Sequence, residues 1–539
     1  MKNLSVIMLS SLAKVFQNKI YGEEQCSAEI AKGQSFSFQL ALRGDNAEYD
    51  INISSQISDC ISVYKVGNVP MTMPTYDSNQ DDDYLTKEKC MCPDPLFPIE
   101  SNRIAVSDEY TAIWVYIDTR KEIDPGEYKI SVSISENGAV VNKSEFNLKI
   151  HSATLPEQEL KFTQWFHTDC ISDVHKVGVY SEEHWNLIEK YIAVASHHGI
   201  NMILVPVLTP PLDTEVGGER TTVQLVKIVK QGDNYFFDFS KLERFIDICL
   251  KCGVKYFEIN HLFTQWGAKN APKVIAEIDG IEQKIFGWET VATSDEYLNF
   301  LRQLIPGIIE TLTKKGIEKS RIVFHVSDEP NMDCIAEYEK AYRAVERLID
   351  GCEQMDALSH FDFYEKGIIK TPVVATNVIE PFLDAGIEGL WCYYCCAQHE
   401  KVSNRFMAMP GYRNRIIGVQ MYRCSIVGFL HWGYNFYNTQ YSKKQINPYE
   451  VTDAGGSFPS GDSFSVYSYK DGAIPSTRIK VFKNAIEDIR LLKLLEQKIG
   501  KAEVDKLIDR VAGMKITFKS YPKNEGFFTD LYREIFKLL

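Results

Sequence analysis

The feature that most constrains the fold of this chain is a repeated unit, in which an amphipathic helix ends in a glycine and a short apolar strand follows. The helix predicted from Ser181 places Trp185 and Ile188 on one face. It ends at Gly199 and leads into a predicted strand at residues 202–205. Glycine commonly follows the last turn of a helix because it adopts the left-handed conformation without strain. The repeat therefore predicts alternating helices and strands around a parallel sheet.

The same unit recurs along the chain, with Gly253, Gly316, Gly351 and Gly386 each preceding an apolar run. Three further runs complete a set of eight predicted strands, at residues 162–166, 202–205, 256–259, 322–324, 355–358, 390–393, 428–432 and 464–467. Eight strands alternating with helices predict a closed (β/α)₈ barrel, and a doubly wound open sheet is the alternative. No glycine-rich phosphate-binding motif follows any of these runs, which argues against the open sheet.

The N-terminal part of the chain has a different rhythm. Apolar residues alternate with a period of two, as in Phe36, Phe38 and Leu40, and the pair Asn137-Gly138 joins two such runs. Asn-Gly between alternating runs is a strong hairpin signal. We therefore predict a multidomain α and β protein, with an antiparallel β-sandwich at 1–155, a catalytic (β/α)₈ barrel at 156–500, and a C-terminal helical extension packed on the barrel at 501–539.

Charge and composition exclude several classes of function. The chain has 59 Lys and Arg against 73 Asp and Glu, which gives a net charge of -14. Such a surface repels phosphate backbones and anionic lipids, so we expect no nucleic-acid partner. No apolar run approaches the ~18 residues of a spanning helix, so we expect no membrane insertion. The oligomeric state is left open.

The cysteines and the first residues bear on the compartment. The 13 cysteines are odd in number and lack the paired spacing of a disulfide scaffold. The first ten residues resemble a weak signal peptide, but they hold one basic residue and serines interrupt the apolar stretch. We therefore expect a cytoplasmic protein.

The strongest candidate for chemistry is the segment 324–330, which reads FHVSDEP. Asp328 and Glu329 follow directly on the fourth predicted strand, and active sites of barrels lie at the C-terminal ends of the strands. The alternative is that one of these acids only begins the next helix, where the dipole favours negative charge.

Two adjacent carboxylates suit one glycosidase mechanism in particular. An ordinary retaining glycosidase holds its acid and its nucleophile ~5 Å apart on opposite sides of the scissile bond. In the substrate-assisted mechanism the 2-acetamido oxygen of the sugar is the nucleophile, so one carboxylate orients the acetamido group and the other protonates the leaving oxygen. Asp328 and Glu329 provide both from one place. Glu258, near the exit of the third strand, is the carboxylate that could instead act as a protein nucleophile.

Aromatic and hydrogen-bonding residues follow several of the other predicted strands. Flat rings and polar groups are what the apolar faces and hydroxyl groups of a sugar require, although any single ring could belong to the barrel core. The candidate substrate-binding residues are Trp165, His167, Asn260, His261, Trp391, Tyr393, Trp432, Tyr434, Asn435 and Tyr467.

Two groups of residues could be considered metal ligands from their spacing. Cys392, Cys395, Cys396 and His399 have ligand-like spacing, as do Cys90 and Cys92, but neither group has a second matched pair. We interpret them as buried or incidental thiols. No metal and no cofactor is expected.

Several motifs together resemble glycoside hydrolase family 123, the β-N-acetylgalactosaminidases, over nearly the whole chain. They lie at 324–330 (FHVSDEP), 390–395 (LWCYYC), 404–406 (NRF), 413–415 (RNR), 428–433 (GFLHWG), 474–478 (IPSTR) and 485–488 (AIED). The resemblance implies a sandwich joined to a catalytic barrel.

The resemblance also implies a reaction. It is that of a retaining, exo-acting hydrolase that removes terminal β-linked N-acetylgalactosamine from glycans or glycolipids through an oxazoline. Asp328 matches the aspartate of the family that orients the acetamido group, and Glu329 matches its acid/base. The alternatives are a β-N-acetylglucosaminidase and a non-catalytic glycan-binding protein of the same fold. The expected partner is a glycan with a terminal N-acetylhexosamine.

Overall fold

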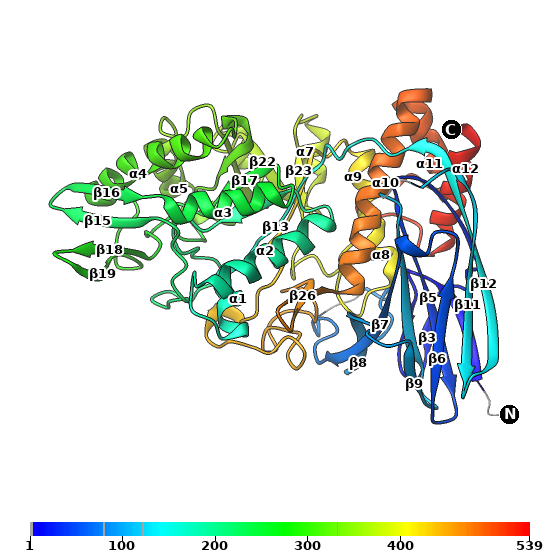
Figure 1. Ribbon diagram of the computed structural model, residues 1–539. Helices are drawn as coiled ribbons and strands as arrows, with labels where there is room; N and C mark the ends of the chain where they lie inside the picture. The colour runs from blue at the N-terminus through cyan, green and yellow to red at the C-terminus, as the bar shows by residue number, and fades with distance from the viewer. Residues whose placement is uncertain (1–3, 79–80, 121–122, 331) are drawn as a thin grey trace.

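The chain folds into an N-terminal pair of β-sheets and a closed barrel, with a group of C-terminal helices between them (Figure 1). The computed structural model describes residues 4–78, 81–120, 123–330 and 332–539. Residues 1–3, where the stretch that resembles a signal peptide begins, lie outside the described residues. The rest of that stretch is strand β1 (Leu4–Ser10), which pairs along its whole length with β5 (Ser35–Gly44).

Two five-stranded sheets face each other in the N-terminal part. One has the order β1, β5, β10 (Thr111–Asp118), β7 (Ile61–Met71) and β8 (Cys90–Pro98). The other has the order β4 (Ser27–Lys32), β12 (Ala139–Thr154), β11 (Gly126–Glu136), β6 (Ala47–Ser54) and β9 (Arg103–Val106). A small hairpin of β2 (Lys14–Val15) and β3 (Ile20–Tyr21) accompanies them.

The alternating pattern predicted the core of this sandwich. Phe38 and Leu40 are fully buried, and the ring of Phe38 stacks on Phe146 of the facing sheet at 4.4 Å between centroids. Asn137 and Gly138 both have positive φ and form the tight turn between β11 and β12. The described strand pairings within the two sheets are antiparallel, as predicted, except for that of β4 with β12, which is parallel.

Eight parallel strands close into a barrel, as predicted. They are β13 (Lys161–Gln164), β14 (Met202–Val205), β17 (Tyr256–Ile259), β20 (Ile322–Phe324), β21 (Glu353–Leu358), β22 (Thr371–Ala375), β23 (Trp391–Tyr393) and β24 (Gly428–His431). The strand before Asp328 and Glu329 is the fourth of the barrel. The fold class is therefore confirmed.

One predicted strand lies outside the barrel, and one barrel strand was not predicted. Residues 464–467 are not in the barrel, because β25 (Val466–Tyr469) pairs with β26 (Gly472–Pro475) in a separate hairpin. The strand that the prediction missed is β22, which contains Pro372 and follows a helix of only four residues, α6 (Asp362–Glu365). A proline and a short preceding helix both weaken the usual strand signal.

The helices lie around the barrel, and two insertions extend from its C-terminal side. The helices are α1 (Thr168–His175), α2 (Glu182–His197), α3 (Ser240–Lys251), α4 (Asp295–Lys314), α5 (Ile335–Val345), α7 (Glu380–Asp384), α8 (Gly411–Arg415) and α9 (Ile417–Arg423). The segments after β14 and β17 together form a four-stranded sheet, seen at the end away from the sandwich in Figure 1. Its strands are β16 (Asn234–Asp238), β15 (Lys227–Gln231), β18 (Val274–Ile278) and β19 (Ile281–Phe286).

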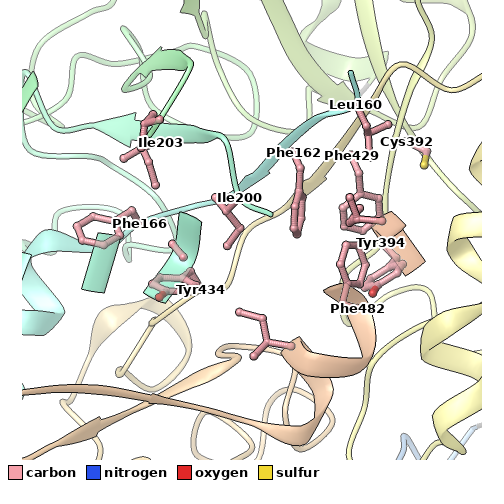
Figure 2. Close-up of a cluster of buried hydrophobic side chains, with 14 of the residues drawn as sticks. Leu160, Phe162, Phe166, Ile200, Ile203, Cys392, Tyr394, Phe429, Tyr434 and Phe482 are labelled. Carbon is pink, nitrogen blue, oxygen red and sulfur yellow. The ribbon is translucent and has the colours of Figure 1, made fainter. Parts of the chain in front are cut away.

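Helix α10 (Thr477–Ile499) packs against the outside of the barrel where it closes. Phe482 of this helix lies 4.8 Å from Phe162 and 4.9 Å from Phe429 between ring centroids, and Figure 2 shows the three rings together. Phe162 belongs to the first barrel strand and Phe429 to the last. The helix therefore covers the seam of the barrel.

The C-terminal helices contact both parts of the chain. Lys501 of α11 (Lys501–Ala512) lies over the ring of Tyr422 in α9, on the barrel side. Phe536 of α12 (Gly526–Leu538) stacks on His151 of β12 at 4.0 Å. The extension thus packs on the sandwich as well as on the barrel. Among the described residues, every helix is too short or too polar to cross a membrane.

A buried ion pair joins the sandwich to α10. Arg478 donates to both carboxylate oxygens of Asp94 on β8, at 2.9 and 2.8 Å. Tyr467 and Thr477 also donate to Asp94, and both charged side chains are almost fully buried. Because each charge depends on the other for its solvation, the pair fixes the barrel relative to the sandwich.

We expect Asp94→Ala to lower the free energy of unfolding by about 3–5 kcal/mol, because it leaves the charge of Arg478 buried without a partner. Urea unfolding followed by circular dichroism measures the change. The control is Glu503→Ala, which removes an exposed pair with Lys506 and should cost about 1 kcal/mol or less. Equal effects of the two substitutions would contradict this role for Asp94.

Candidate active site

A pocket of about 170 Å³ opens at the C-terminal ends of the barrel strands. Segments that follow β13, β14, β17, β20, β23 and β24 contribute to its wall. Its described lining consists of Trp165, Leu212, Asp213, Gln265, Trp266, Asp328, Glu329, Ala357, Tyr393, Cys395, Cys396, Leu430, Trp432, Gln440, Tyr441 and Phe458. The pocket brings together both predicted catalytic residues and three of the ten predicted substrate-binding residues.

The segment that carries Asp328 and Glu329 is held against the segment after β17. The backbone N–H of Trp266 donates to the carbonyl of Asp328 at 2.9 Å, and Ser327 Oγ donates to the carbonyl of Thr264 at 2.8 Å. Glu329 has a φ of 42°, a left-handed conformation that is strained for a residue with a side chain. Its carboxylate accepts a hydrogen bond of 2.8 Å from Tyr393 Oη. The turn thus directs both carboxylates into the pocket.

Both carboxyl groups hold their protons more strongly than usual. Burial raises the pKa of Asp328 well above its ordinary value, and the neighbouring charge of Glu329 adds to the effect. Burial also raises the pKa of Glu329, while the hydrogen bond from Tyr393 opposes it. A raised pKa is what a carboxyl group needs to serve as a general acid near neutral pH.

A buried charged cluster lies beneath the pocket, inside the barrel. His325 Nε2 donates to Glu258 Oε1 at 2.5 Å, and His325 Nδ1 donates to Asp356 Oδ1 at 3.2 Å. All three side chains are inaccessible to solvent. The two carboxylates raise the pKa of His325 to about 10 although burial opposes this, so the imidazole is protonated at neutral pH.

The cluster positions groups of the pocket on two sides. Asp356 accepts a hydrogen bond of 3.1 Å from the backbone N–H of Val326, two residues before Asp328. Glu258 accepts one of 2.6 Å from the indole N–H of Trp165, whose ring lines the pocket. Glu258 therefore forms its hydrogen bonds with buried side chains. The structure places it under the pocket and outside the described lining, which argues against Glu258 as a nucleophile.

The aromatic wall is built from several strands. Trp165 follows β13, Tyr393 ends β23 and Trp432 follows β24. The indole N–H of Trp432 donates to Asp462 Oδ2 at 3.0 Å, which fixes the ring orientation. At the mouth, Trp266 and Tyr441 contact each other edge to face at 5.8 Å between centroids. Flat faces and polar edges of this kind suit a sugar ring.

The structure does not bring the other seven predicted substrate-binding residues to the pocket. The Asn435 side chain accepts from the backbone N–H of His167 and donates to its carbonyl, and His167 Nε2 contacts the carbonyl of Trp432, so both residues support the wall from behind. Tyr434 donates to the carbonyl of Tyr191 on the outer side of the barrel.

The remaining four are also occupied elsewhere. Asn260 accepts from the backbone N–H of Leu208, and His261 stacks on His325 at 4.4 Å inside the barrel. Trp391 is buried in the barrel interior, and Tyr467 donates a hydrogen bond to Asp94, on the sandwich. A buried side chain that follows a strand looks the same in sequence as one that faces the pocket, so the pattern cannot separate them.

Sequence reasoning missed much of the lining. Leu212, Asp213, Gln265, Trp266, Gln440, Tyr441 and Phe458 lie well beyond the strand ends, in long connections. The exposed aromatic Trp266 is the one with a usable signal, since large aromatic residues in loops often mark binding surfaces. Asp213 has no such signal.

One buried group of side chains has the arrangement of possible metal ligands. Ligand atoms of His261, His325 and Asp356 lie within 4.8 Å of one another. However, His325 is protonated and uses both ring nitrogens as donors, so it offers no lone pair to a cation. All thirteen cysteines lie in the described ranges and none of them forms a disulfide, and Cys395 and Cys396 lie on the pocket wall.

A closed barrel with two carboxylates and aromatic rings at its C-terminal face is the arrangement expected of a glycoside hydrolase. The family model of the glycoside hydrolase 123 catalytic domain matches residues 165–495, more than half of the chain. The chain belongs to glycoside hydrolase family 123.

One solved structure agrees with this fold over nearly its whole length. The chain is similar to a family 123 glycoside hydrolase from Clostridium perfringens that was analysed for glycolipid glycan hydrolysis. The two share 14% identity with a TM-score of 0.75, over 99% of this chain and 98% of that chain. A β-D-glucuronidase from Dictyoglomus thermophilum gives a TM-score of 0.33 at 11% identity, over 88% of this chain and 72% of that one. No curated protein sequence matches the chain.

The protonated His325 predicts a pH dependence of stability. Its pKa is raised on folding, so its contribution is complete below the unfolded pKa of 6.5 and is lost as the pH rises to about 10. Between these values each unit rise in pH lowers the contribution of His325 to the free energy of unfolding by about 1.4 kcal/mol.

Urea unfolding from pH 6.5 to 10 measures this slope, and we expect His325→Gln to lack that part of it. A substitution at the exposed His360 is the control and should keep the wild-type slope. Parallel curves for wild type and His325→Gln would show that His325 is neutral in the folded protein.

Proposed function

We propose that the protein is a retaining, exo-acting β-N-acetylgalactosaminidase that uses the 2-acetamido group of its substrate as the nucleophile. The observation that carries the proposal is the position of Asp328 and Glu329, adjacent in sequence and on one wall of a pocket lined with aromatic rings. Adjacent carboxylates fit poorly on the two opposite sides of a scissile bond, as a direct displacement would require.

In the proposed first step, Asp328 accepts the N–H of the acetamido group and holds its carbonyl oxygen beneath C1. That oxygen attacks C1 as the glycosidic bond breaks, and Glu329 gives its proton to the leaving oxygen. The product is an oxazoline on the sugar. In the second step Glu329 takes a proton from water, which attacks C1 from the opposite side and restores the acetamido group with net retention.

The surroundings of the two carboxylates suit these roles. The raised pKa of Glu329 keeps a proton available for the leaving group, and Tyr393 fixes the position of the carboxyl. The N–H of a bound acetamido group would favour the ionised form of Asp328. Ionised Asp328 then stabilises the positive charge that develops on the oxazoline ring.

The size of the pocket and the family support the choice of substrate. A pocket of about 170 Å³ is below the ~300–1,000 Å³ of sites for larger ligands, which supports binding of one terminal sugar. Membership of family 123, and the glycolipid glycan hydrolysis ascribed to the Clostridium perfringens relative, support a terminal N-acetylgalactosamine on a glycan or glycolipid.

We expect the enzyme to release 4-nitrophenol from 4-nitrophenyl N-acetyl-β-D-galactosaminide but not from the analogue with a 2-hydroxyl group, because the analogue lacks the nucleophile. A thiazoline analogue of the intermediate should inhibit strongly. Mass spectrometry after treatment with a 2-fluoro sugar should find no labelled carboxylate. A covalent adduct on Glu258 or Asp213 would contradict the mechanism, and no turnover of any N-acetylhexosaminide would contradict the proposed function.

We expect the two carboxylates to respond differently to substitution. Glu329→Gln should lower kcat/KM about 10²- to 10⁴-fold on substrates with poor leaving groups and much less on activated aryl glycosides, which leave without a proton. Asp328→Asn should lower kcat about 10²- to 10³-fold on both kinds, because it weakens ring formation. Steady-state kinetics on an aryl series tests both. The same leaving-group dependence for both variants would refute the assignment.

A further inference from the structure

The described pocket lining contains a third carboxylate, Asp213, to which the proposed mechanism gives no part. Asp213 lies in the connection after β14, the second strand of the barrel, and shares the pocket with Asp328 and Glu329. Its side chain is half-buried, and this burial raises its pKa to about 6. Burying a carboxylate costs free energy unless it is hydrogen-bonded. The hydrogen-bond partners of Asp213 therefore indicate its role.

Three connections meet at the backbone of Asp213. Its N–H donates to Gln265 Oε1 at 2.7 Å, and its carbonyl accepts from Ser442 Oγ at 2.7 Å. Asp213 has a φ of 40° and Tyr441 a φ of 62°, both in the left-handed region. Such strain persists only where the surroundings determine the conformation. The side chain of Asp213 is therefore held in one place.

One carboxylate oxygen of Asp213 is used and the other is available. Oδ2 accepts a hydrogen bond of 3.1 Å from the backbone N–H of Tyr441. Within the part of the chain that the structure describes, no group donates to Oδ1. The nearby Arg220 is paired with Asp169 at 2.7 Å and donates to the carbonyl of Leu212, so it does not form an ion pair with Asp213.

The order of groups around the pocket indicates which part of a sugar Asp213 would meet. Asp213 is linked to the Asp328 side of the wall, because its N–H donates to Gln265 and the N–H of the adjacent Trp266 donates to the carbonyl of Asp328 at 2.9 Å. Tyr393 contacts Glu329 on the other side. The sequence around the wall is therefore Asp213, Asp328, Glu329 and Tyr393. If Asp328 holds the group on C2 and Glu329 the oxygen on C1, the next ring positions beyond C2 lie toward Asp213. These positions are C3 and C4.

We propose that Asp213 accepts a hydrogen bond from a hydroxyl group on the C3–C4 edge of the terminal sugar. This inference rests on the proposed function, which sets the orientation of the ring. A carboxylate is a strong acceptor for a hydroxyl group, and a site built around such a bond discriminates strongly against a sugar that lacks it.

The test compares Asp213→Asn with wild type on three substrates, 4-nitrophenyl N-acetyl-β-D-galactosaminide and its 3-deoxy and 4-deoxy analogues. The asparagine keeps an acceptor for the N–H of Tyr441, so the connections after β14 and β24 remain linked by this hydrogen bond. We expect kcat/KM to fall about 10- to 100-fold on the full sugar, as for loss of a charged hydrogen bond. The loss should shrink to about threefold or less on at least one deoxy analogue.

The control is Glu215→Gln on the same connection, since the Glu215 side chain forms an exposed ion pair with Lys443 and lies outside the described pocket lining. It should leave all three values unchanged. An equal loss for Asp213→Asn on all three substrates would overturn the proposal, because Asp213 would then only hold the connections together. Labelling of Asp213 by a 2-fluoro sugar would also overturn it.

A binding measurement separates this inference from the proposed function. If the wild type turns over none of the substrates, calorimetry with N-acetylgalactosamine and its 3-deoxy and 4-deoxy derivatives decides the question. At least tenfold weaker binding to Asp213→Asn, with the difference lost on one of the derivatives, supports the assignment of Asp213. Equal binding to both proteins, or no binding to either, overturns it.

Discussion

Closure of the barrel is the constraint on which the rest of the structure depends. Strands β13 and β24 are far apart in sequence, yet they pair from Lys161 beside Gly428 to Gln164 beside His431. Gly428 is required at this seam, because a Cβ there would lie 2.1 Å from the ring of Trp391. Once the seam closes, all eight strands end on one face, and side chains from distant segments share one pocket.

The interior of this barrel is not wholly apolar. The charges of Glu258, His325 and Asp356 are buried where most barrels place aliphatic side chains, and such a cluster is expensive to desolvate. It links the indole of Trp165 to the backbone just before Asp328. Mutual hydrogen bonds offset the free-energy cost of burying these charges. The same cluster fixes the position of the pocket wall.

Strain is concentrated around the pocket. Asp213, Trp266, Glu329 and Tyr441 all line it, and all have positive φ although each carries a side chain. The four residues lie in different connections, which hold one another through backbone hydrogen bonds. The rigid barrel, covered at its seam by α10 and fixed to the sandwich through Asp94, provides the support that such conformations need.

The sequence by itself determined the two-part architecture and the place of Asp328 and Glu329, because periodicity and helix-ending glycines are local signals that survive without tertiary context. It missed β22, whose Pro372 and short preceding helix give no periodic signal. Only the tertiary structure decided which residues after the strands face the pocket. Burial and orientation depend on contacts with segments hundreds of residues away, which is why Tyr393 lines the pocket while Tyr467 binds Asp94 instead.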